Sequence, residues 1–437
     1  MRALLIGGGG REHAIGLSIV KSGTELFVVS HTKNPGLERI SRRIVTGNEN
    51  DREWVLSQAN RIEPDYVFIG PESPLASGVS DMLTKNGFEV FAPSSSAAKL
   101  ETSKSFCRNF LREKGISGNV ESTAFSDMDE IEEFVKSIDY DFVIKPDGLT
   151  GGKGVLVQGI HFRGREEGAK LARAYVGEEG KTVLIEKRLI GEEFSLQAFA
   201  FGGEIFFLPL VQDYKRAFDG DVGPNTGGMG SICFSQRGLP FINREEENEA
   251  KKIMRSIVEN LNDDGIRYVG PIYGGFMATS DGVKLLEINA RLGDPEAINA
   301  LAIMDNSIFD IAVKMLNGMR PELEFRDKIN ALRYVVPRGY GSDPRPSRIS
   351  IDEEKMYLKG IRVFYAAVTK KGKMLQQSSS RSIALFSEGE RIEDVVERFN
   401  QVERLIKGDY FMRKDIGTVA SIEKKKAFMD GLRSKRA

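Results

Sequence analysis

The first 92 residues alternate short apolar runs with amphipathic stretches, and this alternation restricts the fold more than any other feature of the chain. Residues 3–6 and 66–69 are apolar runs of strand length, whereas 51–62 carries apolar residues at helical spacing. Strands that alternate with helices are typical of parallel sheets, because each crossover helix returns the chain to the end of the sheet at which the previous strand began. The pattern predicts an amino-terminal doubly wound α/β domain, followed by a linker at 94–98.

In the rest of the chain, the predicted strands and helices follow a different order. Strands predicted at 142–145, 154–158 and 182–186, with one helix near 166–176, form a small α+β module inserted into a larger one. Further on, Thr279-Ser280-Asp281-Gly282 joins two strands as a hairpin, and 250–261 repeats at helical spacing. The prolines of 337–346 separate a last α+β segment. At 437 residues, the chain has room for two to four such units.

Charge and cysteine content narrow the functional class. The net charge is −1, which disfavours a basic nucleic-acid-binding protein. The two cysteines, Cys107 and Cys233, argue against a disulfide framework and for a reducing compartment. The apolar run 205–211 falls far short of the ~18 residues that a membrane span needs. We therefore expect a cytoplasmic chain.

A run of four glycines at 7–10 precedes Arg11, between a predicted strand and a predicted helix. Backbone N–H groups at a helix start favour an anion, so the run predicts a phosphate or carboxylate site. A dinucleotide fingerprint would need glycine in place of His13 and an acidic residue where Ser30-His31 ends the second strand. A nicotinamide cofactor is thus disfavoured, and glycines that only permit tight packing remain an alternative.

A second glycine-rich turn spans 144–155 and carries two lysines. It fails as a P-loop, because Asp147 stands where the first glycine belongs and Gly154 where Ser or Thr would hold magnesium. A flap that closes over a triphosphate fits better, since such a loop needs glycine for close approach and lysine for charge. An ordinary hairpin is the alternative.

The strand predicted from Leu285 carries alternating polar residues. The side chains expected on its polar face are Glu287, Asn289 and Arg291, and those expected in the core are Leu286 and Ile288. A carboxylate beside an amide oxygen suits Mg²⁺, which prefers oxygen ligands. An exposed polar face is the alternative.

A third polar segment, Asp213 to Arg216, precedes the glycine-rich loop 223–230 and has the character of a substrate clamp. The chain has no visible Ser-His-Asp or Cys-His set, and its histidines lack metal-ligand spacing. Nucleophilic catalysis by a protein side chain is therefore not expected.

Taken in order, these segments resemble the glycinamide ribonucleotide synthetase family of ATP-grasp enzymes, over nearly the whole chain. The runs that carry the resemblance are 9–14, 70–75, 223–230, 291–296 and 413–417. Pro-Asn-Thr-Gly-Gly-Met-Gly and Arg-Leu-Gly-Asp-Pro-Glu are specific to this family, whereas the Lys145 strand and the Glu-x-Asn pair occur in ATP-grasp proteins generally. The sequence departs from the family's usual residues at Gly8, Pro146, Lys187, Tyr214 and Ile298; Tyr214 stands where His is common.

The resemblance implies a fold and a reaction. The implied units are an amino-terminal doubly wound domain (1–102), an ATP-grasp core (103–119 and 187–325), an ATP-grasp lid (120–186) and a carboxy-terminal α+β domain (326–437). The implied activity is that of an ATP-dependent carbon-nitrogen ligase of purine biosynthesis. ATP phosphorylates glycine, and 5-phosphoribosylamine attacks the glycyl phosphate to give glycinamide ribonucleotide, ADP and phosphate. The resemblance implies Mg²⁺ or Mn²⁺ as cofactor and small-molecule partners only; we expect a monomer without nucleic-acid or membrane partners.

The resemblance also implies roles for individual residues. Catalytic roles fall to Arg291, Asp213 and Lys145. ATP contacts fall to Lys104, Lys145, Gly151, Gly152, Lys153, Glu186, Lys187, Leu189 and Glu193. Substrate contacts fall to Gly10, Arg11, Glu12, Glu72, Asp213, Lys215, Arg216, Asn225, Thr226, Gly227, Arg291 and Asp294. The implied metal ligands are Glu287 and Asn289.

Three other functions stay open at this point. Another ATP-grasp carboxylate-amine ligase is the nearest, and the loop 223–230 with 291–296 discriminates against it. A dinucleotide-dependent oxidoreductase is more distant. A non-catalytic nucleotide sensor would bind ATP without releasing ADP.

Overall fold

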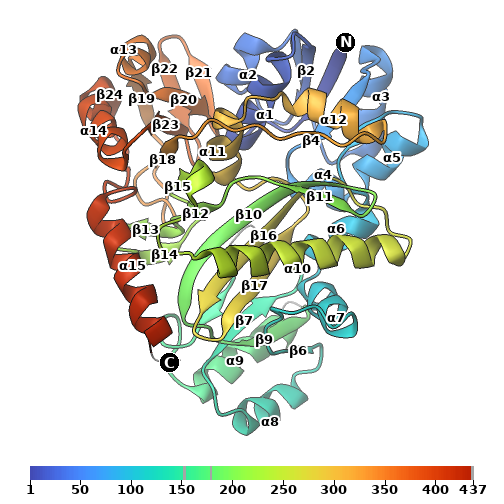
Figure 1. The fold of residues 1–437 in the computed structure, drawn as a ribbon, viewed down its shortest axis with the longest axis vertical. Helices are drawn as coiled ribbons and strands as arrows, with labels where there is room; N and C mark the ends of the chain where they lie inside the picture. The colour runs from blue at the N-terminus through green and yellow to red at the C-terminus, as the bar shows by residue number, and fades with distance from the viewer. Residues whose placement is uncertain (151–153, 178–179, 435–437) are drawn as a thin grey trace.

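The computed structural model describes residues 1–150, 154–177 and 180–434, and within these residues the strands form five sheets (Figure 1). The amino-terminal sheet is parallel throughout, in the order β3-β2-β1-β4-β5. Its strands are β1 (Arg2–Ile6), β2 (Glu25–Ser30), β3 (Arg43–Thr46), β4 (Tyr66–Ile69) and β5 (Val90–Phe91), and its helices include α1 (Gly10–Val20), α2 (Pro35–Ile40) and α3 (Arg52–Ile62). The doubly wound parallel sheet is confirmed; α2 and β3 were not foreseen.

Between β4 and β5 the chain forms two helices, α4 (Glu72–Ala76) and α5 (Val79–Lys85), because Gly78 adopts a φ of 77° that ends the first helix. One local prediction in this region is wrong. The serines of 94–98 do not form a linker. They begin α6 (Ser95–Thr102), where the Ser94 hydroxyl accepts the Ala97 N–H at 3.2 Å as an N-cap.

A small antiparallel sheet with its own apolar core follows α7 (Lys104–Glu113). Its order is β6-β9-β7-β8. Its elements are β6 (Ser122–Phe125), α8 (Asp129–Ser137), β7 (Phe142–Pro146), β8 (Leu156–Val157), α9 (Arg165–Gly177) and β9 (Val183–Lys187). The ring centroids of Phe142 and Phe162 are 5.2 Å apart in its core, which also contains buried side chains of α8 and α9. This is the small inserted module that the sequence predicts.

The central sheet has nine strands in the order β17-β16-β10-β12-β15-β18-β23-β20, with β11 also paired to β10. Its strands are β10 (Gly191–Phe201), β11 (Glu204–Phe207), β12 (Val211–Asp213), β15 (Gly230–Phe234), β16 (Val269–Thr279), β17 (Gly282–Asn289), β18 (Ile329–Val335), β20 (Arg362–Tyr365) and β23 (Ile383–Gly389). Thr279 pairs with Gly282, as the hairpin prediction requires. Strands from beyond residue 326 thus complete the same sheet, and the domain bounds given above stay predictions.

The remaining elements surround this sheet. A four-stranded sheet is formed by β19 (Arg348–Ile351), β21 (Val368–Lys371), β22 (Met374–Gln377) and β24 (Ile406–Gly408), and a hairpin by β13 (Arg216–Phe218) and β14 (Val222–Asn225). The helices are α10 (Arg244–Asp263), α11 (Glu296–Ile303), α12 (Ile308–Leu316), α13 (Glu353–Leu358), α14 (Ile392–Val402) and α15 (Val419–Ser434). In Figure 1, α15 runs along one side of the molecule, beside the β13–β14 hairpin.

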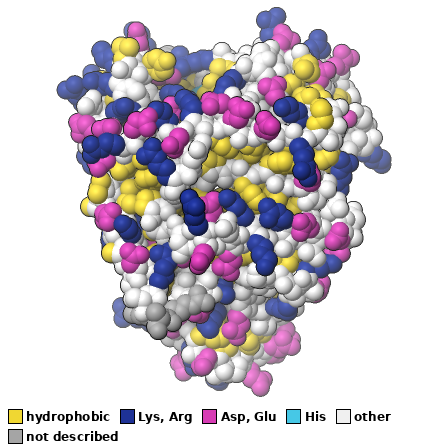
Figure 2. Space-filling view, in the orientation of Figure 1, with side chains coloured by type: hydrophobic (Ala, Val, Ile, Leu, Met, Phe, Trp, Pro, Cys, Tyr) yellow, Lys and Arg dark blue, Asp and Glu magenta, His cyan; other side chains and the backbone are white. Residues whose placement is uncertain are grey.

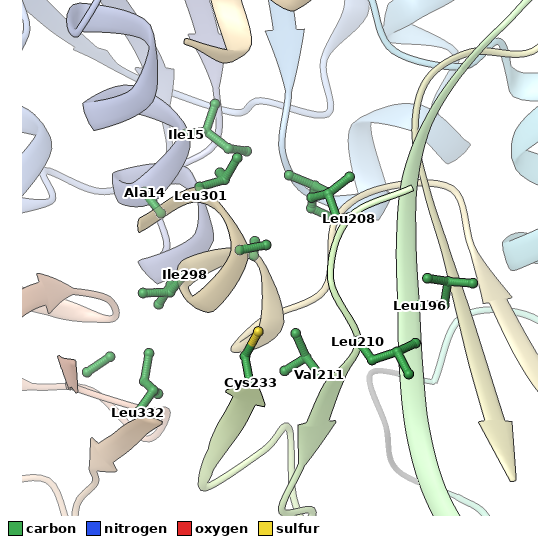
Figure 3. Close-up of a cluster of buried hydrophobic side chains, with 14 of the residues drawn as sticks. Ala14, Ile15, Leu196, Leu208, Leu210, Val211, Cys233, Ile298, Leu301 and Leu332 are labelled. Atoms are coloured by element: carbon green, nitrogen blue, oxygen red, sulfur yellow. The ribbon is translucent and has the colours of Figure 1, made fainter. Parts of the chain in front are cut away.

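Helix α11 lies between the amino-terminal domain and the central sheet. Figure 3 shows Ile298 and Leu301 of α11 among Ala14 and Ile15 of α1 and side chains of the sheet. All are buried in one hydrophobic cluster. Because α11 starts at Glu296, this packing also fixes the end of the Arg-Leu-Gly-Asp-Pro-Glu motif.

The surface is mixed in charge. Figure 2 shows Lys and Arg side chains interspersed with Asp and Glu over the face that it presents, in keeping with a net charge of −1. No helix in the described part of the chain has the length and apolarity to cross a membrane.

Candidate active site

Strand β17 brings the predicted metal ligands into place through a bulge. Gly275 pairs with Glu287 and Phe276 with Leu285, so Leu286 is the extra residue on β17. Leu285 and Ile288 are buried while Leu286 is partly exposed. The prediction that Leu286 enters the core is therefore wrong, because a bulge shifts the alternation by one residue.

Glu287 is held as a carboxylate by surrounding cations. Its side chain is exposed toward the site. Partial desolvation by the surrounding protein would raise its pKa, but Lys215, Lys145, Arg291 and Lys104 outweigh this effect and lower the pKa. Asn289 follows two residues later on β17 and is half-buried. The described residues contain no cluster of three or more His, Cys, Asp or Glu that could hold a metal. Two oxygen ligands fit a hard cation that keeps water and shares substrate phosphates.

Lys145 is oriented by a buried ion-pair network. Its Nζ lies 2.6 Å from Glu186 Oε2, and Arg108 Nε lies 2.7 Å from Glu186 Oε1. Burial raises the pKa of Glu186, but the two cations lower it to about 2. The Glu186 side chain, which the resemblance assigns to ATP binding, therefore holds Lys145 in place. Arg108 was not foreseen, because one arginine on an amphipathic helix has no distinguishing signal.

Arg108 also reaches the bulge. It donates to the carbonyl oxygens of Leu285 at 2.7 Å and Leu286 at 2.9 Å. One side chain therefore links β9, which bears Glu186, to the strand that bears Glu287.

Lys104 and Asp147 join the start of α7 to the second glycine-rich turn. Lys104 Nζ donates to the carbonyl oxygens of Pro146 at 3.0 Å and Gly148 at 2.7 Å. The Asp147 carboxylate accepts the Lys104 N–H at 2.5 Å and the Ser105 N–H at 3.3 Å. Burial, with help from Lys145, lowers the pKa of Lys104. Gly151, Gly152 and Lys153, expected at ATP, lie outside the described residues.

The other expected ATP residues follow this sheet. Lys187 ends β9, with its Nζ 5.3 Å from the centre of the Tyr140 ring, and Leu189 lies in the segment between β9 and β10. Glu193 on β10 lies 2.8 Å from Lys215 Nζ. An expected ATP contact and an expected substrate contact are therefore paired with each other.

A pair of acids, the partly buried Asp213 and the buried Glu296, lies beside this lysine. Burial and repulsion from Glu296 raise the pKa of Asp213, and burial raises the pKa of Glu296. Asp213 Oδ1 has no hydrogen-bond partner among the described residues. A Cβ on Gly228, which has a φ of +102°, would lie 2.6 Å from Asp213 Oδ1 and 2.7 Å from Pro295 Cδ. The backbone at Gly228 therefore approaches Asp213 so closely that a side chain at position 228 would not fit.

Glu296 was not among the predicted site residues, although it ends the Arg-Leu-Gly-Asp-Pro-Glu motif.

Asp294, two residues before Glu296, is held by residues of the carboxy-terminal part of the chain. Tyr334 Oη donates to Asp294 Oδ1 at 2.6 Å, and Arg381 Nη1 lies 3.3 Å from the same oxygen. Arg381 Nη1 also donates to the carbonyl oxygen of Gly227. Tyr334 and Arg381 come from the last third of the chain and match no predicted motif.

Arg291 lies between two carboxylates of the amino-terminal region. Its Nη2 is 3.1 Å from Glu101 Oε1, and its Nε is 3.3 Å from Glu72 Oε2 without hydrogen-bond alignment. Burial opposes the charged form, but Glu101 and Glu72 raise the pKa of Arg291. The sequence gives no signal for Glu101, since it follows the linker predicted at 94–98 and lies outside every predicted motif.

The first glycine run is packed tightly against other elements. Arg11 is buried, with Nε 2.7 Å from Glu12 Oε1 and Nη1 donating to the Leu292 carbonyl at 2.9 Å. Glu12 accepts the Gly9 N–H at 2.6 Å. A Cβ on Gly10 would lie 2.5 Å from Tyr334 Oη. Gly10 is thus required by the approach of β18.

The β13–β14 hairpin carries the remaining expected substrate residues. Arg216 pairs with Asn225, and its Nη1 donates to the Gly223 carbonyl at 2.9 Å. Thr226 Oγ1 donates to the Lys215 carbonyl at 2.9 Å, and the Gly227 N–H donates to Tyr340 Oη at 3.3 Å. The segment predicted as a substrate clamp therefore forms a hairpin, and the residue after its second strand, Thr226, hydrogen-bonds back to Lys215 just before its first strand.

Comparison with known proteins agrees with this arrangement. Residues 1–101 match the family described as phosphoribosylglycinamide synthetase, N domain, and residues 102–297 match its ATP-grasp (A) domain. The chain is 40% identical over 434 residues to a phosphoribosylamine-glycine ligase of Pyrococcus furiosus, covering 99% of this chain and 98% of that protein. It is 38% identical over 435 residues to one from Methanococcus maripaludis, covering 97% and 98%.

Solved structures give the same result. The phosphoribosylamine-glycine ligase of Thermotoga maritima superposes with a TM-score of 0.80 at 26% identity, covering 95% of this chain and 100% of that one. A biotin carboxylase domain from Hydrogenobacter thermophilus has a TM-score of 0.72 at 14% identity, covering 98% and 93%, which shows a shared fold alone. With matches along its whole length, the chain belongs to the phosphoribosylglycinamide synthetase family.

Proposed function

We propose that this chain is a phosphoribosylamine-glycine ligase of purine biosynthesis. In this reaction ATP phosphorylates the glycine carboxylate, and the amine of 5-phosphoribosylamine displaces phosphate from the glycyl phosphate. The observation that carries the proposal is the gathering of Lys104, Lys145, Lys215 and Arg291 around Glu287, next to the acid pair Asp213–Glu296. Such a reaction depends on positioning and charge neutralisation, which these side chains supply without a protein nucleophile.

The phosphates of ATP would lie near the two lysines at the start of α7 and on β7. Lys145 is already oriented by Glu186, so little side-chain freedom is lost when it binds. Glu287 and Asn289 would hold a divalent cation, Mg²⁺ or Mn²⁺. When bound, that cation supplies positive charge to phosphate oxygens. The ATP contacts of Lys187, Leu189 and Glu193 belong to this proposal.

Glycine would occupy the space beside Asp213 and Glu296. Two neighbouring acids with raised pKa values cannot both ionise at little cost, and an ammonium group would relieve their repulsion. Arg291, fixed by Glu72 and Glu101, would hold the reacting carboxylate.

The sugar substrate would lie between the first glycine run and the β13–β14 hairpin. Arg11 pairs with Glu12 and donates to the Leu292 carbonyl. The residue before Leu292, Arg291, lies against Glu72. The loop at Asn225 to Gly227 and the carboxylate of Asp294 complete this side of the proposed site. The chain is proposed to act as a monomer.

An ADP-release assay tests the proposal. Magnesium, ATP, glycine and 5-phosphoribosylamine made in situ from ribose 5-phosphate and ammonia are omitted one at a time, and each omission should abolish ADP release. Equal efficiency with alanine or aspartate in place of glycine would show a different ATP-grasp ligase. ATP binding without any ADP release would show a nucleotide sensor. Tight NADH binding would favour the oxidoreductase.

A further inference from the structure

The run Arg413-Lys414-Asp415-Ile416-Gly417 has no role in the reaction as described so far. It precedes α15 and lies beyond residue 297, where the family-model matches end. Arg413 is fully buried, which is costly for a guanidinium unless it is paired and hydrogen-bonded. Its partners therefore indicate what it stabilises.

All polar contacts of Arg413 point to its own turn or to the β13–β14 hairpin. Its Nη1 donates to the Arg216 carbonyl at 2.9 Å and lies 2.9 Å from Asp221 Oδ1. Its Nε and Nη2 donate to the two oxygens of Asp415 at 2.8 and 2.6 Å. The fork of N–H donors on the Arg413 guanidinium thus joins the first strand of the hairpin, the end of its turn and the carboxy-terminal segment.

The hairpin turn is bound from the other side as well. The Lys414 N–H donates to Asp219 Oδ1 at 2.8 Å, and the Gly220 N–H donates to Asp415 Oδ2 at 2.9 Å. Within the hairpin itself the register joins only Arg216 to Asn225 and Phe218 to Val222, with an irregularity between them. A two-stranded ribbon of this length is marginally stable alone, so the external contacts hold its shape.

Tyr214 extends this contact to the substrate residues on either side of it. Its side chain is 2% exposed, and both Arg413 and Lys425 lie over its ring, at 5.1 and 5.3 Å from the centroid. Lys425 of α15 is in turn 3.0 Å from Glu192 and 3.2 Å from Asp221. Tyr214 follows Asp213 and precedes Lys215 in the chain.

We infer that Arg413 and Lys425 are positioning residues, which fix Asp213 and Lys215 in the substrate site by holding Tyr214 and the β13–β14 hairpin. The inference rests on the proposed function for the identity of the substrates. It gives the carboxy-terminal segment a part in substrate binding without any contact to substrate. It also gives a role to Tyr214, where the family usually has His: the ring of Tyr214 contacts both cations.

Asp221→Asn is the mildest test, because Asn also tolerates the left-handed φ of 59° and only the charge is lost. Arg413→Lys keeps the charge but removes the fork. For both variants the KM for glycine or 5-phosphoribosylamine should rise about tenfold, as expected for loss of a charge-assisted hydrogen bond, while the KM for ATP stays within about twofold. An equal rise in the KM for ATP would overturn the inference.

Arg433→Gln is the matched control. Arg433 is on α15 too, but it pairs with Glu246 at 2.7 Å, on α10 and away from the hairpin. It should leave all three KM values unchanged. If it reproduced the effect of Asp221→Asn, general docking of α15 would be the cause and the positioning role would be wrong.

A structural readout separates this inference from the proposed function. Trypsin can cleave after Lys215 and Arg216, and the rate at which fragments beginning at 216 or 217 appear can be followed by mass spectrometry. These fragments should appear faster in Asp221→Asn and Arg413→Lys than in the unmodified protein or Arg433→Gln. Equal rates in all four proteins would overturn the inference. A wild-type chain without glycine-dependent ADP release would instead contradict the proposed function and leave this readout valid.

Tyr214→Phe, which keeps the ring, should behave as wild type, whereas Tyr214→Leu should resemble Arg413→Lys.

Discussion

Residue identity predicts the chemistry of this site better than its geometry. Glu287, Asn289 and Arg291 stand out in the sequence because charged and amide side chains alternate with apolar ones. The bulge at Leu286 cannot be read from that pattern, since it depends on the pairing of Gly275 with Glu287 across the hairpin. Arg108, Glu101 and Arg381 were missed for a related reason. Each acts through a partner far away in sequence, and local periodicity holds no information about such partners.

Glu287→Gln tests the metal ligand. The substitution keeps the shape of the side chain and removes the charge that the surrounding cations stabilise. Turnover should fall by at least ~100-fold, because charge neutralisation by a bound cation supplies several kcal/mol. Circular dichroism and the melting temperature should show a folded protein. Near-normal turnover would place the metal elsewhere.

The Asp213–Glu296 pair predicts a pH-dependent stability. A carboxyl with a raised pKa in the folded state stabilises the fold below its ordinary pKa, and this contribution is lost as pH rises through the folded-state value. In the unliganded protein, the free energy of unfolding of wild type should therefore fall relative to that of Asp213→Asn as pH increases from 5 to 9. Denaturant titrations of both proteins measure the difference. A constant difference over this range would contradict the raised pKa of Asp213.

At the scale of elements, turn chemistry explains both the successes and the failures of the sequence analysis. The hairpin at Thr279 to Gly282 was predictable because its residues are those that such turns require. The serines of 94–98 suggested a coil, but serine is also a preferred N-cap, and α6 begins there. Composition alone does not separate these two uses of serine.

Asp147→Ala tests the link between α7 and the second glycine-rich turn. The carboxylate accepts N–H groups at the start of α7 and keeps Lys104 beside the Pro146 carbonyl. Its loss should raise the KM for ATP about tenfold and destabilise the fold by about 1 kcal/mol. Asp51→Ala is the control, because Asp51 caps α3 by accepting the Trp54 N–H at 3.1 Å. It should cause a similar loss of stability with an unchanged KM for ATP; a change in the KM for ATP there would show that the effect is not local.

At the scale of the whole molecule, the parallel amino-terminal sheet and the inserted module follow from the order of elements. The extension of the central sheet by β18, β23 and β20 does not. Proline spacing suggested a separate carboxy-terminal unit after residues 337–346, yet β23, which follows those prolines, pairs with β18 residue for residue from Ile329 to Val335. Long-range strand pairing is decided by which edges remain open after the earlier strands have paired, and a linear pattern does not record this.

Gly10→Ala tests the contact between distant parts of the chain. The new Cβ would lie 2.5 Å from Tyr334 Oη, so the amino-terminal domain and β18 would have to separate slightly. Overpacking of this kind costs about 1–3 kcal/mol. The KM for 5-phosphoribosylamine should rise, because Tyr334 also holds Asp294, whereas the KM for ATP should remain close to normal.

The double variant Gly10→Ala/Tyr334→Phe supplies the check. Removal of the hydroxyl makes room for the methyl group, so thermal melts should show part of the lost stability recovered. A double variant less stable than either single variant would show that steric contact with Tyr334 is not the cause.

The pairing of β15 with β18 also sets the order in which a growing chain can fold. Strand β15 leaves the ribosome well before β18, and during that interval its backbone N–H and C=O groups on one edge have no neighbour. The amino-terminal sheet and the inserted module can pair all their strands early, but the central sheet must wait for β18 and then β23. A chain that stops before residue 329 would therefore keep an open edge in its largest sheet and be prone to self-association, however well its first two units had folded.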